Sequence, residues 1–222
     1  MTESLNISVW SDIACPWCFV GKARLDSALE EFKSAPDAPT VSVNWRAFEL
    51  DPRPREASTV AYAKRLASKY NRSLAEAQQM LDTMTAAIQS EGGEANFDTV
   101  IAANTFNAHR LIQWAGTDDV QRSQPDAQHL LTDALMRGYL GHGLNLSVDA
   151  EMLAIVTAVG LDEARARLIL EGEEFGGKVR ADEQEAHSHG ISGVPFFVIG
   201  QYGVSGAQES ETLLQVMKDA SA

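Results

Sequence analysis

The only two cysteines in the chain, Cys15 and Cys18, stand on either side of Pro16 and Trp17. A strand-like run at 7–10 precedes this motif, and a helix-like run follows it. If Cys15 caps the helix and Pro16 is its first residue, the helix N-terminus favours a thiolate at Cys15. Cys18 lies one turn further on, so the two sulfurs can cycle between a dithiol and a disulfide. The motif therefore predicts thiol–disulfide exchange.

A zinc site and a structural disulfide are the alternatives for this cysteine pair. A structural zinc site needs four ligands, and the chain contains no second cysteine pair. The close histidines, His187 and His189, lie in a polar run typical of a solvated helix face. A structural disulfide would close a very small loop and constrain the unfolded chain little. We therefore expect a redox pair, with no metal and no cofactor.

Length, charge and composition limit the classes of function. With 222 residues and 45% hydrophobic residues, the chain can bury one sizeable core. A formal net charge of −13 disfavours nucleic acid and anionic membranes as partners. No apolar run approaches the length of a membrane span, and residues 1–6 lack the basic and apolar regions of a signal peptide. Since both cysteines serve one site, a cytoplasmic location is expected.

The order of elements predicts two parts. Strand-like runs at 7–10 and 41–45 flank the first helix and form a βαβ unit, and Pro52 and Pro54 then interrupt regular structure. Helical patterns follow at 59–70, 73–89, 105–114, 126–140, 150–159 and 161–170, and the chain ends with a helix at 179–189, strands at 196–199 and 203–204, and a helix at 209–220. We expect one domain to comprise 1–55 and 178–222, with an inserted helical domain at 56–177.

A βαβ unit with a Cys-x-x-Cys motif, followed by a ββα unit with a proline just before its first strand, describes an α/β thioredoxin-like fold. The sequence resembles the DsbA-like thiol oxidoreductases, especially their FrnE-like cytoplasmic branch. The matching segments are Ser-Asp at 11–12, Cys-Pro-Trp-Cys at 15–18, Gly-Lys at 21–22, Asn-Thr at 104–105, Ala-His-Arg-Leu at 108–111, Ser-Gly-Val-Pro-Phe-Phe at 192–197 and Val-Ser-Gly-Ala-Gln at 204–208. They span nearly the whole chain.

The resemblance implies that the Val194–Pro195 peptide bond is cis and lies beside the sulfurs. Such a bond would present the Val194 backbone to an extended substrate, as in recognition by an edge strand. A trans proline that opens an edge strand is the commoner arrangement in proteins at large. Because the resemblance favours the cis bond, we place Pro195 with Cys15 and Cys18 in the catalytic site. Val194, Trp17 and Pro16 are the expected substrate-binding residues, although Trp17 could also be a lid over the disulfide.

Three polar residues near these motifs are ambiguous. Asp12 and Lys22 bracket the cysteines and could tune their charge, or either could face water. His109 lies among apolar residues of a helix, so a hydrogen-bonded structural histidine is favoured over a general base. We leave all three out of the catalytic set.

The expected function is a thiol–disulfide oxidoreductase or isomerase that acts on disulfide-containing or unfolded protein clients. Cys15 would attack and Cys18 would resolve the mixed disulfide, with glutathione or a thioredoxin system as the thiol partner. Two alternatives share the fold: a glutathione-dependent isomerase or kappa-class glutathione transferase, and a non-catalytic peptide-binding module. The inserted helices should cover the active site and form an apolar wall opposite Trp17, so extended clients should bind better than compact ones.

Overall fold

The computed structural model describes residues 4–53 and 57–221, and within them a four-stranded sheet carries the site. Its strands are β1 (Leu5–Ser11), β2 (Val41–Ala47), β3 (Phe196–Ile199) and β4 (Tyr202–Ser205), in the spatial order β2-β1-β3-β4. β2 is parallel to β1, whereas β3 is antiparallel to both β1 and β4. The predicted thioredoxin-like arrangement, βαβ then ββα, is confirmed.

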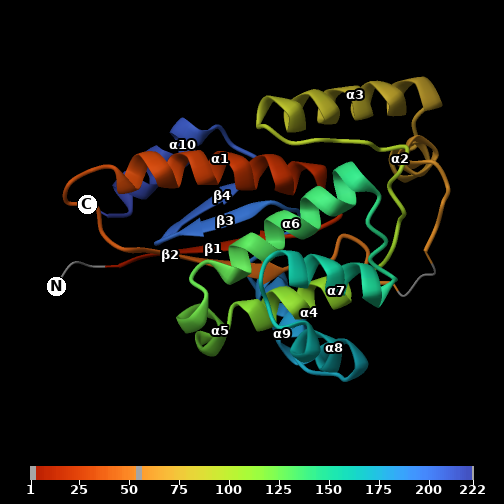
Figure 1. Cartoon of the computed structure of the whole chain (residues 1–222). Helices are drawn as coiled ribbons and strands as arrows, with labels where there is room; N and C mark the ends of the chain where they lie inside the picture. The colour runs from red at the N-terminus through yellow and green to blue at the C-terminus, as the bar shows by residue number, and fades with distance from the viewer. Residues whose placement is uncertain (1–3, 54–56, 222) are drawn as a thin grey trace.

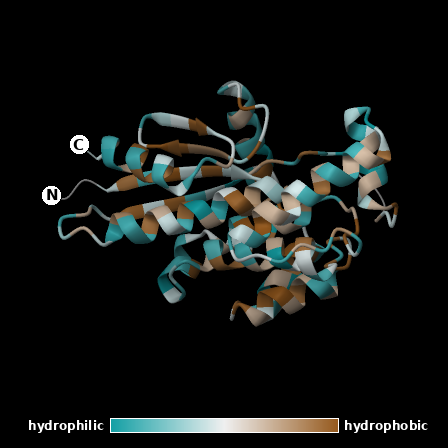
Figure 2. Ribbon diagram, turned by 90° about the horizontal axis from the view of Figure 1, so that it is seen from above, coloured by the Kyte–Doolittle hydropathy of each residue, from teal (hydrophilic) through white to brown (hydrophobic). Residues whose placement is uncertain are grey.

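The two faces of the sheet follow from the alternation of side chains along each strand. Ile7 and Val9 belong to the main buried cluster, as do residues of α1 (Pro16–Lys33) and α10 (Ser210–Asp219). Trp10 points to the other face and packs with Ala186 of α9 (Gly176–Ser188). Figure 1 shows α1 and α10 on one side of the sheet and α9 on the other, and Figure 2 shows hydrophobic residues along the strands.

The helix that starts at the cysteine motif begins as predicted. Cys15 is its N-cap residue, in an extended conformation, and Pro16 occupies the first turn, where a missing N–H costs nothing. Leu25, Ala28, Leu29 and Phe32 are all buried and form the stripe that packs on the sheet. The helix thereby fixes Cys15 at one end of the sheet.

Among the described residues, seven helices lie between β2 and α9, in the region that the sequence predicts to be helical. They are α2 (Tyr62–Tyr70), α3 (Leu74–Ser90), α4 (Phe106–Ala115), α5 (Asp118–Ser123), α6 (Ala127–His142), α7 (Asp149–Ala158) and α8 (Glu163–Glu171). Ser73 and Glu76 form the expected capping box at the start of α3. The short α5 has no counterpart in the prediction. Helix α9 begins at Gly176, earlier than the predicted Val179, because the low helix propensity of glycine led the prediction to leave out Gly176 and Gly177.

Of the two predicted domain limits, only the one at 177/178 lies within the described residues. The limit at 55/56 lies outside the described residues, as do 1–3 of the segment inspected for a signal peptide. The limit at 177/178 falls inside the first turn of α9. One buried cluster joins the strands and α1 to α3, α4, α6, α7 and α8, so the inserted helices share the core of the sheet. No helix in the described part of the chain is long and apolar enough to cross a membrane.

Side chains of α4, α6 and α9 form hydrogen bonds with the outer edge of β2 near its C-terminal end. Gln128 of α6 accepts a hydrogen bond from the Trp45 N–H and donates one to the Trp45 carbonyl, at 3.0 and 3.1 Å. Gln113 of α4 also donates to that carbonyl, at 2.9 Å, and Asp182 of α9 accepts from the Ala47 N–H at 3.0 Å. The N–H and carbonyl of Trp45 and the N–H of Ala47 are therefore paired at this edge of the sheet.

Candidate functional site

Cys15 and Cys18 lie together at the start of α1, as free thiols. The Cys18 N–H donates to the Cys15 carbonyl at 3.0 Å, which is the first turn of the helix. Both side chains are buried in the main core cluster, Cys15 at 5% and Cys18 at 1% exposure, but only Cys15 lines a large groove. The turn therefore presents one sulfur to an incoming molecule and keeps the other behind it.

Burial raises the pKa of the Cys18 thiol well above its ordinary value, and the neighbouring Cys15 adds to the rise. A thiol with a raised pKa stays protonated at neutral pH and becomes a thiolate only as the pH rises. The raised pKa therefore lowers the reactivity of the Cys18 thiol at neutral pH.

Iodoacetamide added to the reduced protein at neutral pH should therefore modify one cysteine, Cys15. Intact-mass measurement should give a single adduct per chain, and peptide mapping should place it. Cys18 should react only when the pH is raised or the protein is unfolded, for two reasons: its raised pKa and its burial. Equal modification of both thiols in the folded protein at neutral pH would contradict this difference.

The Val194–Pro195 bond is cis and lies beside the first sulfur, as the resemblance implies. The Cys15 thiol donates to the Val194 carbonyl at a Sγ to O distance of 3.7 Å. Pro195 is buried against α1, where a Cβ on Gly21 would come within 2.8 Å of the proline Cγ. Gly21 therefore allows the close approach of the helix to the proline, which explains the use of glycine here.

Asp12 organises the loop that leads into the motif. Its carboxylate accepts hydrogen bonds from the backbone N–H groups of Ala14 and Leu50, at 3.2 and 2.7 Å. Its carbonyl accepts from the Cys15 N–H at 3.1 Å. His109 Nε2 lies 3.6 Å from Asp12 Oδ1, and both side chains are almost fully buried. His109 is thus a buried neighbour of the loop and does not line the groove, but its Nε2 lacks the hydrogen bond expected of a structural histidine.

The alternative that Asp12 or Lys22 faces water is wrong. Asp12 is 1% exposed because its carboxylate and carbonyl accept hydrogen bonds from the backbone of the loop, and Lys22 is 5% exposed. The Lys22 ammonium forms ion pairs with Asp26 at 2.7 Å and with Asp133 of α6 at 2.8 Å. Lys22 therefore ties α1 to the inserted helices.

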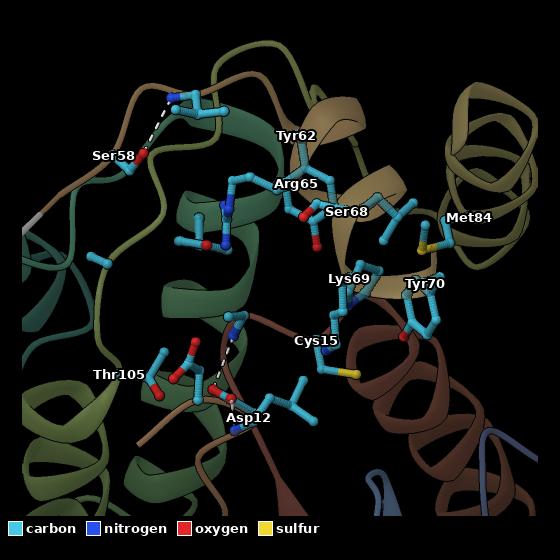
Figure 3. A pocket seen from close by; sticks show the side chains of 18 of the residues that line it. Asp12, Cys15, Ser58, Tyr62, Arg65, Ser68, Lys69, Tyr70, Met84 and Thr105 are labelled. Carbon is cyan, nitrogen blue, oxygen red and sulfur yellow. Dashed lines mark hydrogen bonds between the residues drawn. The ribbon is translucent and has the colours of Figure 1, made fainter. Parts of the chain in front are cut away.

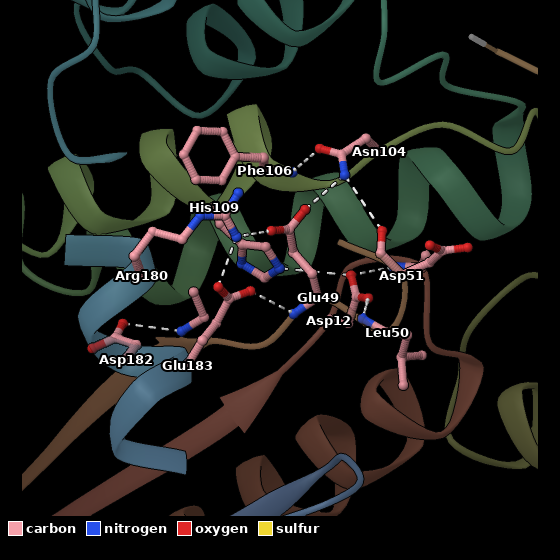
Figure 4. Close-up of polar contacts among 12 residues, drawn as sticks. Asp12, Glu49, Leu50, Asp51, Asn104, Phe106, His109, Arg180, Asp182 and Glu183 are labelled. Atoms are coloured by element: carbon pink, nitrogen blue, oxygen red, sulfur yellow. Dashed lines mark hydrogen bonds and ion pairs between the residues drawn. The ribbon is translucent and has the colours of Figure 1, made fainter. Parts of the chain in front are cut away.

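A second polar cluster lies next to this loop, and Figure 4 shows how its side chains converge. Glu49 is held by Arg180 of α9 and accepts a hydrogen bond from the Asn104 side chain at 2.7 Å. Arg180 also pairs with Glu183 at 2.7 Å. Burial raises the pKa of Glu49. The cluster braces the loop after β2 against α9 and the start of α4.

An open groove of about 1020 Å³ borders Cys15, and Figure 3 shows side chains of α2 turned into it. Pro16 and Trp17 line it from α1, and Trp17 is 40% exposed. The groove contains several further exposed apolar side chains, namely Leu50, Val60 and Tyr70. Its volume reaches the upper end of the range of about 300–1,000 Å³ that is usual for small-molecule sites. Val194 and Pro195 are not among its lining residues.

The wall formed by the inserted helices is more polar than the sequence predicts. Tyr62, Leu66 and Met84 supply apolar surface, as expected, but Lys64, Arg65 and Lys69 of α2 also line the groove. Together with Arg53, the described lining residues include four cationic side chains against two acidic ones, Asp12 and Asp51. The predicted apolar wall is therefore only partly correct, because one face of α2 brings positive charge to Cys15.

Of the residues predicted for the site, Cys15, Pro16 and Trp17 border the groove, Cys18 lies behind them, and Val194 contacts the first sulfur. Sequence reasoning missed the cationic residues of α2 and the role of Asp12 in the loop. The Lys-Arg pair at 64–65 with Lys69 one turn on was the available signal for the first.

Comparison with known proteins gives one family match and several similar structures. A family model for the DSBA-like thioredoxin domain matches residues 6–218. A crystal structure described as a "probable DsbA oxidoreductase" from Streptomyces coelicolor is 35% identical, with a TM-score of 0.84 over 97% of this chain and 89% of that one.

Two more distant structures share the fold. The cytosolic disulfide reductase DsbM from Pseudomonas aeruginosa, solved with GSH, is 13% identical, with a TM-score of 0.61 over 97% of this chain and 95% of that one. A 2-hydroxychromene-2-carboxylate isomerase is 12% identical, with a TM-score of 0.66 over 96% and 95%. At these identities the likeness concerns the fold alone.

Proposed function

Since this chain belongs to the DSBA-like thioredoxin domain family, a family of thiol oxidoreductases, we propose that it exchanges disulfides with protein clients through Cys15 and Cys18. The observation that carries the proposal is the unequal placement of the two sulfurs. Cys15 borders an open groove at a helix N-terminus, and Cys18 is buried one turn behind it with a raised pKa. This is the arrangement that a nucleophile and a resolving thiol require.

In the reducing direction, the Cys15 thiolate attacks one sulfur of a client disulfide. A bond forms between Cys15 and the client, and the other client sulfur leaves as a thiolate and takes up a proton. Cys18 then loses its proton and attacks the Cys15 sulfur, which releases the second client thiol and leaves the Cys15–Cys18 disulfide. Two electrons pass from the dithiol to the client. A thiol reductant such as glutathione or a thioredoxin system restores the pair.

The groove beside Cys15 favours an extended client segment as substrate. Its volume lies at the upper end of the range for small-molecule sites and leaves room for a peptide segment, and the exposed rings of Trp17 and Tyr70 offer apolar contacts. The Val194 backbone and Pro195 would border the client segment on the other side of the sulfur. We therefore propose unfolded or disulfide-containing proteins as clients, and isomerisation of their disulfides as a related reaction of the same pair.

We also propose that the protein acts in the cytoplasm, in the FrnE-like branch of the family. Its two cysteines serve one site, which is usual where structural disulfides do not persist. Glutathione is a suitable partner in that compartment, and the similar disulfide reductase from Pseudomonas aeruginosa was solved with it.

The test is reduction of insulin by dithiothreitol with and without the protein, followed by the turbidity of the released B chain. The protein should shorten the lag before precipitation. A Cys18→Ser variant, incubated with the same substrate, should accumulate as a mixed disulfide that migrates as a larger species on a non-reducing gel, because no resolving thiol remains. No acceleration and no trapped adduct would contradict the proposal and strengthen the small-molecule alternative.

A further inference from the structure

Helix α2 is unusually basic for this protein. The chain has a formal net charge of −13, yet the segment Tyr62–Tyr70 contains Lys64, Arg65 and Lys69 and no acidic residue. All three cations line the groove that Cys15 borders. Figure 3 shows Arg65 and Lys69 of α2 and Cys15 of α1 around the same cavity. Positive charge is thus concentrated in the groove that Cys15 borders, in an otherwise acidic protein.

These three cations form no ion pair with a carboxylate in the described part of the chain. Cations elsewhere do: Arg24 pairs with Glu91 at 2.7 Å, and Lys22 pairs with Asp26. At the groove, Arg53 is bound by Asp51 at 2.8 Å. The net charge makes acidic partners plentiful, so the absence of one for α2 leaves this face available to an anionic ligand.

Aromatic rings hold two of these cations in place. The Arg65 guanidinium lies over the Tyr62 ring at 5.4 Å, and the Lys69 ammonium lies over the Tyr70 ring at 5.6 Å. Arg65 Nη1 is buried and has no hydrogen-bond partner. A buried donor without a partner is costly, and a carboxylate oxygen would satisfy it. The face therefore presents cations that are oriented before a ligand arrives.

We propose that α2 selects clients whose disulfide is flanked by aspartate or glutamate, with Lys64, Arg65 and Lys69 as the residues that bind the carboxylates. The inference rests on the proposed disulfide exchange and names the kind of client that the same site prefers. The groove contains both the cations and exposed apolar side chains, so it fits an extended acidic peptide that also carries apolar residues. A long polyanion is disfavoured because the rest of the chain would repel it.

The experiment compares three peptides that differ only in the residues flanking one internal disulfide: glutamate, glutamine or lysine. The kcat/KM for reduction of each is divided by the rate constant for its reaction with dithiothreitol alone, which removes the effect of flanking charge on the intrinsic reactivity of the disulfide. We expect the normalised value to be about tenfold higher for the glutamate peptide than for the lysine peptide at low salt. The difference should shrink at high ionic strength.

Charge variants locate the effect. The double variant Lys64→Gln, Lys69→Gln should bring the glutamate-to-lysine ratio close to one. The matched control is Lys33→Gln, Lys218→Gln, which removes the same charge from exposed lysines of α1 and α10 outside the groove. This control should retain the ratio. If it loses the ratio to the same extent, overall charge causes the preference, and the assignment to α2 is wrong.

The remaining outcomes separate this inference from the proposed function. Equal normalised values for all three peptides would overturn the inference and leave disulfide exchange standing. No catalysed reduction of any peptide would overturn the exchange activity itself. A higher value for the lysine peptide would show that α2 does not contact the flanking residues.

Discussion

Replacement of Cys15 by serine should reduce the catalysed rate of insulin reduction to the uncatalysed background. The hydroxyl of serine is not ionised at neutral pH and cannot form the mixed disulfide, and Cys18 cannot take over because it is buried and protonated. The measurement is the turbidity assay, with the initial rate compared among the wild-type protein, the variant and a reaction without protein.

The fold of the Cys15→Ser variant serves as the internal control. Serine is close in size to cysteine and is a good helix N-cap residue, so the far-ultraviolet circular dichroism spectrum and the melting temperature should stay near those of the wild type. Substantial activity in a folded Cys15→Ser variant would show that Cys18 is the attacking thiol and that the assigned roles are reversed. Activity in a Cys15→Ser, Cys18→Ser double variant would mean that the protein acts in this assay by binding insulin and not by exchanging disulfides.

Replacement of Phe19 by alanine should lower the free energy of unfolding by about 3–5 kcal/mol, which corresponds to a fall in melting temperature of about 6–20 °C. Phe19 is 1% exposed and lies at the junction between α1 and the inserted helices. A Cβ on Gly93 would lie 2.4 Å from its ring, and the Arg137 guanidinium lies 5.0 Å from the ring centroid. Loss of the ring removes contacts with both neighbours and leaves a cavity.

Chemical denaturation followed by circular dichroism measures this loss, and Leu168→Ala is the control. Leu168 of α8 is 58% exposed, so its truncation should change stability by no more than about 0.5 kcal/mol. Because one buried cluster joins the sheet to the inserted helices, the Phe19 variant should still unfold in a single transition. Two separate transitions would indicate that the predicted domains 1–55 with 178–222 and 56–177 unfold independently.

Local patterns made much of this structure predictable. The Cys-Pro-Trp-Cys motif between a strand and a helix predicts Cys15 as the N-cap residue, and the strand-like run at 7–10 predicts the strand that the structure shows as β1. Strand β3 has the predicted bounds, Phe196–Ile199. In each case, residues close in sequence decide the outcome, so propensity and periodicity are sufficient.

Features that depend on distant residues could not be predicted in this way. Lys22 and Asp12 are buried because Asp133, Leu50 and His109 meet them after the chain has folded. No pattern of neighbouring residues in the sequence predicts contacts with such distant residues, and a charged residue is usually exposed. For the same reason, the basic face of α2 resembles an ordinary solvated helix face until the structure places it beside Cys15.

The pairing of Gln128 with the outer edge of β2 has a consequence for behaviour at high concentration. An unpaired strand edge is a template for strands of other molecules and so for aggregation. The Gln128 side-chain amide accepts a hydrogen bond from the Trp45 N–H and donates one to the Trp45 carbonyl, as a neighbouring strand would. The Asp182 carboxylate accepts one from the Ala47 N–H. Helices α4, α6 and α9 thus keep the end of β2 at Trp45 and Ala47 from pairing with a strand of another molecule, and a shortened chain without α4 and α6 would lose this protection at Trp45.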